Sequence, residues 1–449
     1  MEKKTVLISN KIKKFTKIVK IPGDKSCSIR ALLLASQCIG ESKIYNLLES
    51  ADVLDCLKVL KALNVKIVKK KNHYSVRGNG LNSFRVKKKI TRLYIGNSLT
   101  TARLLSGLLS TIPAKFYIYG DTSANRRDFM RVIEPLEKVG AHFYPRKKNL
   151  PLTIEGTSWA LAQRHKEKRG SSQVKGLILL SALSTPGITT VEELKEKSSR
   201  THTEIFLKKI GCDIKINKTK KTNLIHLRGQ KNLYSFNYSV GNDPSSAAFL
   251  ICLALLTPGS KLTLPGILCD DKRIGFIKIL KRMNGRVEIK NLKKDSSSGE
   301  LVGTVVAYGS KLKPVTVSEN VAKFIDELPI LFACAAMQDG ISKFHRCQEL
   351  IHKETNRLLE MKKILNQIGI KCKIKKNNVM IIYGKKNIET KNKSLTVNIP
   401  GDHRINLVAA IISLATGIKT KIKSFDSTYT SFPGFISIIK NLGGKIVIK

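Results

Sequence analysis

Six segments of the chain have the length of a helix and are apolar on nearly every side. Each is rich in small and branched apolar residues, and each is followed by a β-rich stretch. A helix that is hydrophobic all round is buried, so we expect six helices inside the fold. The segments are ALLLASQCIG, ARLLSGLLSTIP, VKGLILLSALSTPG, AAFLICLALLTPG, LPILFACAAMQDG and NLVAAIISLATG.

A second pattern recurs between these segments. An amphipathic helix ends at Gly or Asn and is followed by a strand, a turn and, in all but the shortened last copy, a returning strand. The copies are spaced by roughly 75 residues, so six repeats of the order β-α-β-α-β-β account for the chain. The predicted residues at the helix ends are Asn64, Gly140, Gly211, Gly285, Gly369 and Gly443.

The repeats predict an α/β (α+β) fold of two domains with three repeats in each. In every repeat we expect the apolar helix inside and the amphipathic helix outside. Residues 22–240 form one domain. Residues 1–21 and 241–449 form a discontinuous second domain, because the N-terminal segment has no place among the first three repeats.

Polar residues typical of helix N-caps precede each apolar helix. A helix N-terminus presents free N–H groups and a partial positive charge, so it favours anions. If the inner helices of a domain share one direction, their N-termini meet, and we expect an anion-binding active site in the cleft between the domains. The segments are GDKS at 23–26, GNS at 96–98, SSQ at 171–173, GNDPSS at 241–246, IDE at 325–327 and GDHR at 401–404.

The formal net charge of +48 suggests nucleic acid, a membrane surface or acidic substrates as partners. The lysines are spread along the whole chain, mostly in predicted exposed hairpins. Aromatic residues, which stack on bases in many nucleic-acid-binding proteins, make up only 6%. We therefore interpret most of the excess charge as solvated surface, and we keep a basic nucleic-acid-binding protein as the alternative of another class.

Several other enzyme classes lack their motifs in this sequence. GDKS at 23–26 has no earlier glycine to complete a P-loop, and no HExxH, GxSxG or spaced His/Cys cluster occurs.

The nine cysteines form no CxxC pair and lie mostly in apolar segments, which favours reduced thiols in the core. The apolar stretches are shorter than a membrane span, so we expect a cytoplasmic protein with no membrane partner.

Eight motifs follow one another between about residues 20 and 435: PGDKSCSIRALLLAS, GNSLTTARLL, GDTSANRRDFMRVIEPLEKVGA, SSQVKGLILLSAL, GNDPSSAAFL, IDELPIL, HKETNR and GDHRINLVAA. Together and in this order they resemble the EPSP synthase (3-phosphoshikimate 1-carboxyvinyltransferase) family. The fold that this resemblance implies is a two-domain inside-out α/β barrel, with three β-α-β-α-β-β units in each domain. It agrees with the repeats described above.

The resemblance implies transfer of the enolpyruvyl group of phosphoenolpyruvate to the 5-hydroxyl of shikimate 3-phosphate. The reaction passes through a tetrahedral intermediate and releases phosphate without a metal or cofactor, as a step of the shikimate pathway to chorismate and the aromatic amino acids. We expect a monomer with these two anionic small molecules as its partners, and no nucleic acid. The enolpyruvyl transferase acting on UDP-N-acetylglucosamine remains an alternative, although KSxSxR and KETNR favour the shikimate type.

The resemblance also assigns roles to individual residues. Lys25 is the cation shared by both substrates, Asp326 accepts the hydroxyl proton, and Glu354 exchanges a proton at the methylene carbon. Phosphoenolpyruvate is held by Lys25, Asn97, Thr100, Arg127, Gln173, Arg357 and Arg404, with the backbone of 97–100 as a cradle. Shikimate 3-phosphate is held by Lys25, Ser26, Arg30, Ser171, Ser172, Gln173, Ser199, Asp326 and Lys353.

Three positions depart from the family pattern. Leu99 replaces the glycine that lies against phosphoenolpyruvate and the herbicide glyphosate in the family. A leucine pointing into a packed pocket costs about 1–3 kcal/mol, so we expect weaker phosphoenolpyruvate binding and insensitivity to glyphosate. Asp128 stands where a proline usually follows the arginine at position 127, and Thr430 stands where some members have a lysine.

Overall fold

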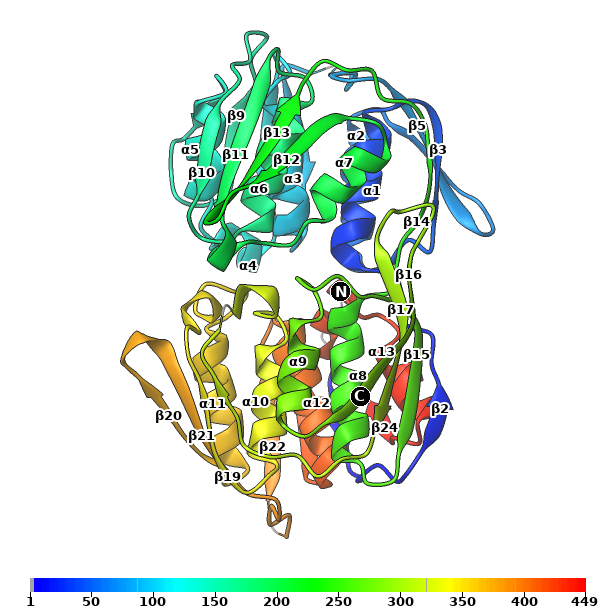
Figure 1. Cartoon of the computed structure of the whole chain (residues 1–449), viewed down its shortest axis with the longest axis vertical. Helices are drawn as coiled ribbons and strands as arrows, with labels where there is room; N and C mark the ends of the chain where they lie inside the picture. Colours follow the sequence, from blue (N-terminus) through cyan, green and yellow to red (C-terminus); the bar gives the residue numbers. More distant parts are fainter. Residues whose placement is uncertain (1–3, 87, 320, 392) are drawn as a thin grey trace. The chain divides into compact units, whose positions relative to one another are not determined.

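The computed structural model describes residues 4–86, 88–319, 321–391 and 393–449. The chain divides into two compact units, each with helices inside and sheets outside (Figure 1). Unit 1 comprises Met1–Pro22, Asn242–Lys294 and Leu301–Lys449, and unit 2 comprises Gly23–Gly241 and Asp295–Glu300.

Residues 295–300 belong to unit 2, whereas the sequence prediction keeps them with the rest of 241–449. Two hydrogen bonds explain the difference. Oε1 of Glu300 lies 2.8 Å from Nδ1 of His202, and the Ser297 hydroxyl accepts from the backbone N–H of Ser239 at 3.0 Å. Both partners, His202 and Ser239, belong to unit 2, so residues 295–300 are held within that unit.

The described part of unit 2 has three four-stranded sheets. In each, an edge strand pairs in parallel with its neighbour and the remaining pairs are antiparallel. The orders are β14 (Asn237–Ser239), β3 (Ile39–Tyr45), β5 (His73–Asn79), β4 (Lys66–Lys69); β6 (Ile90–Tyr94), β7 (Lys115–Tyr119), β9 (Leu152–Glu155), β8 (His142–Tyr144); and β10 (Arg164–Glu167), β11 (Ile188–Leu194), β13 (Thr222–Arg228), β12 (Asp213–Lys218).

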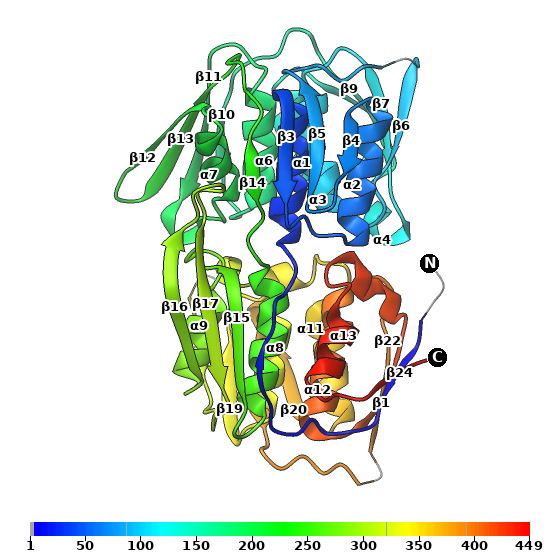
Figure 2. The same ribbon diagram turned by 90° about the vertical axis from the view of Figure 1, so that its right-hand side faces the viewer.

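Three helices form the interior of unit 2, namely α1 (Lys25–Ser36), α3 (Leu99–Leu109) and α6 (Ser172–Ala182), and α3 packs against both of the others (Figures 1 and 2). A Cβ at Gly107 of α3 would lie 2.2 Å from the carbonyl oxygen of Leu177 of α6, so only glycine permits this close approach. The remaining helices are α2 (Ala51–Ala62), α4 (Thr122–Asn125), α5 (Met130–Glu137), α7 (His202–Lys209) and the short η1 (Lys195–Lys197).

Unit 1, as far as it is described, repeats this sheet pattern, with one parallel pair at an edge of each sheet. The orders are β22 (Ser394–Asn398), β23 (Lys419–Lys423), β1 (Val6–Ile8), β24 (Ile446–Ile448); β16 (Arg286–Lys294), β17 (Leu301–Tyr308), β15 (Lys261–Leu268), β2 (Thr16–Ile18); and β18 (Thr316–Val317), β19 (Gly340–Phe344), β21 (Val379–Gly384), β20 (Lys371–Lys375).

The interior of unit 1 consists of α8 (Pro244–Leu256), α10 (Leu328–Ala336) and α12 (His403–Thr416), which pack on one another and are buried along almost their whole length. Their side chains belong to one continuous apolar core. The other helical segments are α9 (Gly275–Arg282), α11 (Arg357–Gln367), α13 (Phe435–Asn441), η2 (Val321–Lys323), η3 (Gln348–Leu350), η4 (Lys376–Asn378) and η5 (Phe425–Thr430).

The predicted α/β fold class is confirmed, and the six apolar segments are the buried inner helices. The number of sequence repeats stays a prediction. One predicted helix end is wrong: Asn284, and not Gly285, has the left-handed conformation after α9, with φ of 63°. Asn tolerates this conformation better than other residues with a side chain, which explains why it serves here.

The cysteines are all free thiols, and eight of the nine are buried. Burial raises the pKa of Cys38, Cys56 and Cys347 to about 12, so these thiols stay protonated and inert at neutral pH. Among the described residues, every helix falls short of the length and apolarity needed to cross a membrane.

Candidate functional site

The predicted helix N-caps of unit 2 are present at all three inner helices. Asp24 accepts from the backbone N–H of Cys27 at 2.8 Å, and Ser98 and Ser171 cap α3 and α6 in the same way. A Cβ at Gly23 would lie 2.2 Å from the carbonyl oxygen of Asn46, which explains the glycine that precedes Asp24. The starts of these helices carry most of the predicted anion-binding residues of unit 2.

Lys25 and Arg30 are both fixed on α1. Nζ of Lys25 donates to Oδ2 of Asp52 at 2.8 Å, so a buried carboxylate holds the proposed shared cation. Arg30 donates through Nη1 to the Ser26 hydroxyl at 2.6 Å and through Nε to the Thr203 hydroxyl at 2.9 Å. Two of the predicted shikimate 3-phosphate ligands, Ser26 and Arg30, therefore lie in direct contact.

The pKa of Arg30 is lowered, because complete burial disfavours its charge more than the nearby carboxylates of Asp24 and Glu204 favour it. An arginine keeps its proton at neutral pH in spite of such a shift. Arg30 is thus a buried cation whose charge its surroundings compensate only in part, and an anionic ligand would supply the rest.

Thr100 and Gln173 are brought together where α3 meets α6. Nε2 of Gln173 donates to the Thr100 hydroxyl at 2.9 Å, and Nη1 of Arg103 donates to Oε1 of Gln173 at 2.6 Å. The side-chain amide of Gln173 is therefore held from both ends.

The other predicted residues of unit 2 lie in loops and first turns. Asn97 donates to Oδ2 of Asp121 at 2.8 Å, and Asp121 is the N-cap of α4. Arg127 follows α4 and is half-buried. Ser199 donates to Oε2 of Glu193 through its backbone N–H at 3.2 Å and its hydroxyl at 3.3 Å. Ser171 and Ser172 stand at the half-buried start of α6.

The five predicted residues of unit 1 form one contiguous cluster. Oδ1 of Asp326 lies 3.2 Å from Nζ of Lys353 and 3.6 Å from Nη1 of Arg357, and its Oδ2 lies 3.9 Å from Nη2 of Arg404. Nη2 of Arg357 donates to Oε2 of Glu354 at 2.5 Å. Two carboxylates thus stand among three cations, an arrangement that suits proton transfer next to bound anions.

Burial sets the electrostatics of this cluster. Burial lowers the pKa of Lys353. The charge of Asp326 raises this pKa, whereas the charge of Arg357 lowers it further. Burial also disfavours the charge of Arg357, but Asp402 and Glu354 outweigh it and the pKa of Arg357 is raised. Asp402 accepts from Nε of Arg357 at 3.0 Å and from its Nη2 at 3.2 Å, so a two-point ion pair fixes the guanidinium.

The predicted cap before α10 is wrong. Glu327 occupies the N-cap position but makes no side-chain hydrogen bond to the helix backbone. Its Oε1 instead accepts from the hydroxyl of Ser245, whose oxygen also accepts from Arg273 at 3.3 Å. A buried polar network, rather than a helix cap, holds the residue next to Asp326.

Cys27, His202 and Glu300 are the one group among the described residues with the types and spacing of a metal site. Their ligand atoms lie within 4.8 Å of one another and all three side chains are buried. Nδ1 of His202 is hydrogen-bonded to Glu300, and the thiol of Cys27 is hydrogen-bonded to the Tyr238 hydroxyl. Protein groups therefore already engage each of the three, and the arrangement is that of a hydrogen-bonded network.

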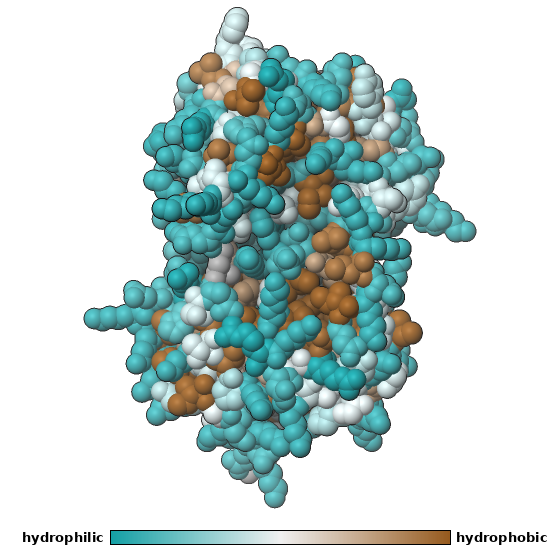
Figure 3. Space-filling view, viewed as in Figure 1, coloured by the Kyte–Doolittle hydropathy of each residue, from teal (hydrophilic) through white to brown (hydrophobic). Residues whose placement is uncertain are grey.

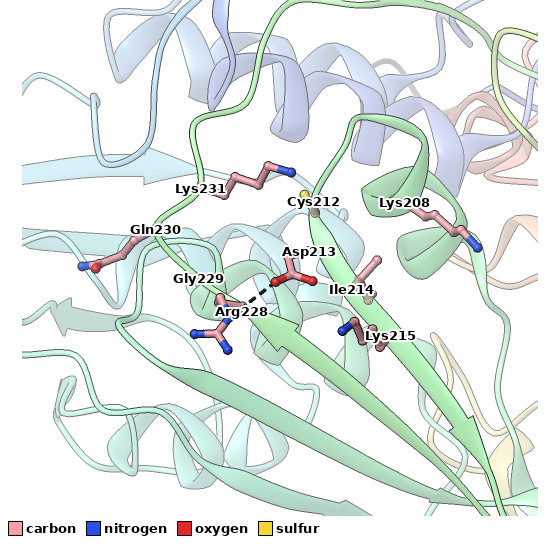
Figure 4. A pocket seen from close by; sticks show the side chains of 9 residues that line it. All are labelled: Lys208, Cys212, Asp213, Ile214, Lys215, Arg228, Gly229, Gln230 and Lys231. Carbon is pink, nitrogen blue, oxygen red and sulfur yellow. Dashed lines mark ion pairs between the residues drawn. The ribbon is translucent and has the colours of Figure 1, made fainter.

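A surface pocket of unit 2 lies away from the predicted residues (Figure 4). It is lined by exposed cations including Lys208 and Lys231, and its one carboxylate, Asp213, pairs with Arg228 at 3.4 Å. Burial raises the pKa of Cys212, which also lines it, to about 12. Figure 3 shows hydrophilic residues over much of the visible face of both units. With 81 lysines and arginines against 33 acidic residues, cations are common throughout the chain and do not mark this pocket.

The sequence analysis missed several ion pairs that hold the candidate site in place. Asp52 and Asp402 pair with Lys25 and Arg357, and Lys175 is completely buried in an ion-pair cluster. One signal was available for Lys175, since it is the only charged residue in the apolar segment VKGLILLSAL. Its partners are distant in sequence, and no local pattern points to them.

The cluster of two carboxylates among three cations suits an enzyme that acts on small anions. The model of the EPSP synthase (3-phosphoshikimate 1-carboxyvinyltransferase) family matches residues 9–439. The 3-phosphoshikimate 1-carboxyvinyltransferase of Bartonella tribocorum is 35% identical over 99% of this chain and 100% of its own length, and that of Acidiphilium cryptum is 34% identical over 96% and 95%.

Solved structures agree with the family match. The EPSP synthase of Acinetobacter baumannii superimposes with a TM-score of 0.83 at 30% identity, covering 99% of this chain and 100% of that one. The enolpyruvyl transferase NikO of Streptomyces tendae, with a TM-score of 0.77 at 16% identity over 100% and 99% of the chains, shares the fold. The chain belongs to the EPSP synthase family of enzymes. The resemblance found in the sequence is confirmed, and neither alternative is favoured.

Proposed function

We propose that the chain transfers the enolpyruvyl group of phosphoenolpyruvate to the 5-hydroxyl of shikimate 3-phosphate. The observation that carries this proposal is the unit 1 cluster, in which Asp326 lies within 3.9 Å of the cations of Lys353, Arg357 and Arg404. Phosphate and carboxylate groups of the substrates are the natural ligands of these cations.

In the addition step, the 5-hydroxyl oxygen bonds to C2 of phosphoenolpyruvate. Asp326 accepts the hydroxyl proton while Glu354 delivers a proton to the methylene carbon C3. In the elimination step, Glu354 takes a proton back from C3, the C2–C3 double bond re-forms, and the C2–O bond to phosphate breaks. The hydroxyl proton held by Asp326 passes to the leaving phosphate, so both carboxyl groups return to their starting states. Each carboxylate has a cation beside it to stabilise its charged form, Lys353 for Asp326 and Arg357 for Glu354.

The proposed ligands are divided between the units, with Lys25, Arg30 and Gln173 in unit 2 and Asp326 and Glu354 in unit 1. We propose that the two units contribute to one active site and close on the substrates, which also excludes water from the tetrahedral intermediate. A cytoplasmic location and a monomeric state belong to the same proposal. Light scattering with and without both substrates tests the oligomeric state.

Phosphate release from phosphoenolpyruvate tests the function. We expect release that depends on shikimate 3-phosphate, and a fall in kcat of about 10²- to 10⁴-fold in Asp326→Asn and in Glu354→Gln. Glu360→Gln, which alters an exposed ion pair with Lys363 on α11, is the matched control and leaves kcat unchanged. Release that depends on UDP-N-acetylglucosamine instead would replace this function with the alternative.

A further inference from the structure

Lys175 is the most deeply buried ammonium group of unit 2 whose contacts are described, with no exposed side-chain surface. Its Nζ lies 3.0 Å from Oε2 of Glu193 and 2.7 Å from Oε1 of Glu204, and both carboxylates are also buried. The three residues come from α6, the end of β11 and the first turn of α7. Burying three charged groups has a large desolvation cost, so we looked for a function that the triad serves.

One arm of the triad leads to Ser199. Oε2 of Glu193, the same oxygen that pairs with Lys175, accepts from the backbone N–H of Ser199 at 3.2 Å and from its hydroxyl at 3.3 Å. The other oxygen, Oε1, accepts from Nδ2 of Asn223 at 3.2 Å. Glu193 therefore fixes the Ser199 loop, and Lys175 neutralises the carboxylate that does so.

The second arm leads to Arg30. Glu204 follows Thr203 on α7, and the Thr203 hydroxyl accepts from Nε of Arg30 at 2.9 Å. The charge of Glu204 also acts on the guanidinium of Arg30. A Cβ at Gly176, the residue after Lys175, would lie 3.1 Å from the Thr203 hydroxyl, so α6 packs closely on this contact.

We propose that Lys175 is a positioning residue for shikimate 3-phosphate: it touches no substrate, but holds Glu193 under Ser199 and Glu204 beside Arg30 so that both ligands of the substrate keep their geometry. This inference rests on the proposed function, since it takes Ser199 and Arg30 as shikimate 3-phosphate ligands. The contacts described for the triad lead to Ser199 and, through Thr203, to Arg30, both proposed ligands of shikimate 3-phosphate, so we expect the effect to fall on this substrate.

The ammonium of Lys175 stays charged throughout the working range of pH. Burial alone disfavours the charge, but Glu204 and Glu193 outweigh it and the pKa of Lys175 is raised. The triad is therefore a fixed electrostatic support and not a pH switch.

The test compares the Lys175→Met/Glu204→Gln double variant with the wild type. The double variant removes one charge of each sign, so the triad keeps its net charge. Glu193 loses the ammonium that holds it under Ser199, and an uncharged amide replaces the Glu204 carboxylate beside Arg30. We expect the Kd and KM for shikimate 3-phosphate to rise about 10- to 100-fold, with kcat and the KM for phosphoenolpyruvate changed by less than about threefold. Calorimetry and phosphate release supply the two readouts.

Ser181→Ala is the matched control, because it removes a buried hydroxyl from the same helix, where Ser181 donates to the carbonyl of Ile178 at 2.9 Å. It leaves the affinity for shikimate 3-phosphate unchanged even if it lowers the melting temperature. If the double variant does not fold, Glu193→Gln replaces it. In Glu193→Gln the side-chain amide oxygen can still accept a hydrogen bond from Ser199. We therefore expect a smaller rise in Kd than in the double variant, again for shikimate 3-phosphate and not for phosphoenolpyruvate.

The outcomes separate the two proposals. An active wild type whose variants bind shikimate 3-phosphate normally, or lose affinity for both substrates alike, overturns the role of Lys175 and leaves the proposed function standing. A wild type that neither binds shikimate 3-phosphate nor releases phosphate overturns the proposed function, and this inference with it.

Discussion

Nη1 of Arg103 lies 2.6 Å from Oε1 of Gln173, although the two residues are 70 positions apart in the chain. The same guanidinium donates through Nη2 to the carbonyl oxygen of Asp128 at 3.2 Å. One arginine thereby ties the start of α6 to the loop that carries Arg127, and both Gln173 and Arg127 are proposed ligands of phosphoenolpyruvate.

Replacing Arg103 should weaken the binding of both substrates. In Arg103→Met the amide of Gln173 loses its charged donor, and Gln173 is the side chain proposed to touch phosphoenolpyruvate and shikimate 3-phosphate alike. We expect both KM values to rise about 10- to 100-fold in steady-state assays. Arg92→Met, which alters an exposed arginine stacked on Tyr117 in β7, serves as the control. A change in one KM alone would contradict this account.

The affinity for shikimate 3-phosphate should fall as the pH rises, and this fall should occur at a lower pH than the pKa of an exposed lysine would give. Burial lowers the pKa of Lys353, so its ammonium loses the proton as pH rises through this lowered pKa, and the phosphate loses a cation. Asp326 raises the pKa of Lys353, so Asp326→Asn should move the loss of affinity to still lower pH. Calorimetric titrations at a series of pH values measure the affinity for shikimate 3-phosphate. Lys353→Met should lack this step, and a step that persists in this variant must arise elsewhere.

Leu99 should be responsible for weak phosphoenolpyruvate binding and for insensitivity to glyphosate. Its side chain is only 2% exposed at the first turn of α3. Leu99→Gly should lower the KM for phosphoenolpyruvate by about 5- to 150-fold, the equivalent of about 1–3 kcal/mol, and make glyphosate a competitive inhibitor. Potent inhibition of the wild type by glyphosate would refute the prediction. A melting curve checks that the variant folds, since removing a buried leucine costs about 2–5 kcal/mol.

The Arg357–Asp402 pair should be important for stability. Both side chains are at most 1% exposed, and Asp402 also caps α12 by accepting from the backbone N–H of Arg404. Asp402→Ala should lower the free energy of unfolding by about 3–5 kcal/mol, because it leaves a buried charge unpaired. Glu319→Ala, which breaks an exposed pair with Arg282, should cost about 0–1 kcal/mol. Urea unfolding measures both free energies, and an equal decrease in Asp402→Ala and Glu319→Ala would show that burial of the pair is not the cause.

The sequence predicted the elements whose signal is local. Hydrophobic periodicity identified the six inner helices, because a helix apolar all round has no stable place except the interior. Cap residues such as Asp24 and Asp402 were predicted because a short polar side chain next to an apolar run acts on its own helix. The same rule failed at Glu327, whose side chain is engaged by a residue 82 positions away.

The supports of the candidate site could not be predicted in this way. Lys175 and Glu193 are 18 positions apart, and Arg357 and Asp402 are 45 apart. Lys175 of α6 meets Glu193 of β11, and Arg357 of α11 meets Asp402 before α12, only after these elements have packed together. The ligand roles came from the family resemblance rather than from spacing, and they stay predictions until variants are measured.

Hydrogen exchange at the methylene carbon of phosphoenolpyruvate tests the central claim most directly, because the account requires protonation and deprotonation at that carbon. The enzyme is incubated in D₂O with phosphoenolpyruvate and shikimate 3-phosphate, and deuterium in recovered phosphoenolpyruvate is followed by NMR. The account predicts exchange that requires shikimate 3-phosphate and is lost in Glu354→Gln. Exchange that persists without shikimate 3-phosphate, or at the wild-type rate in Glu354→Gln, would contradict it.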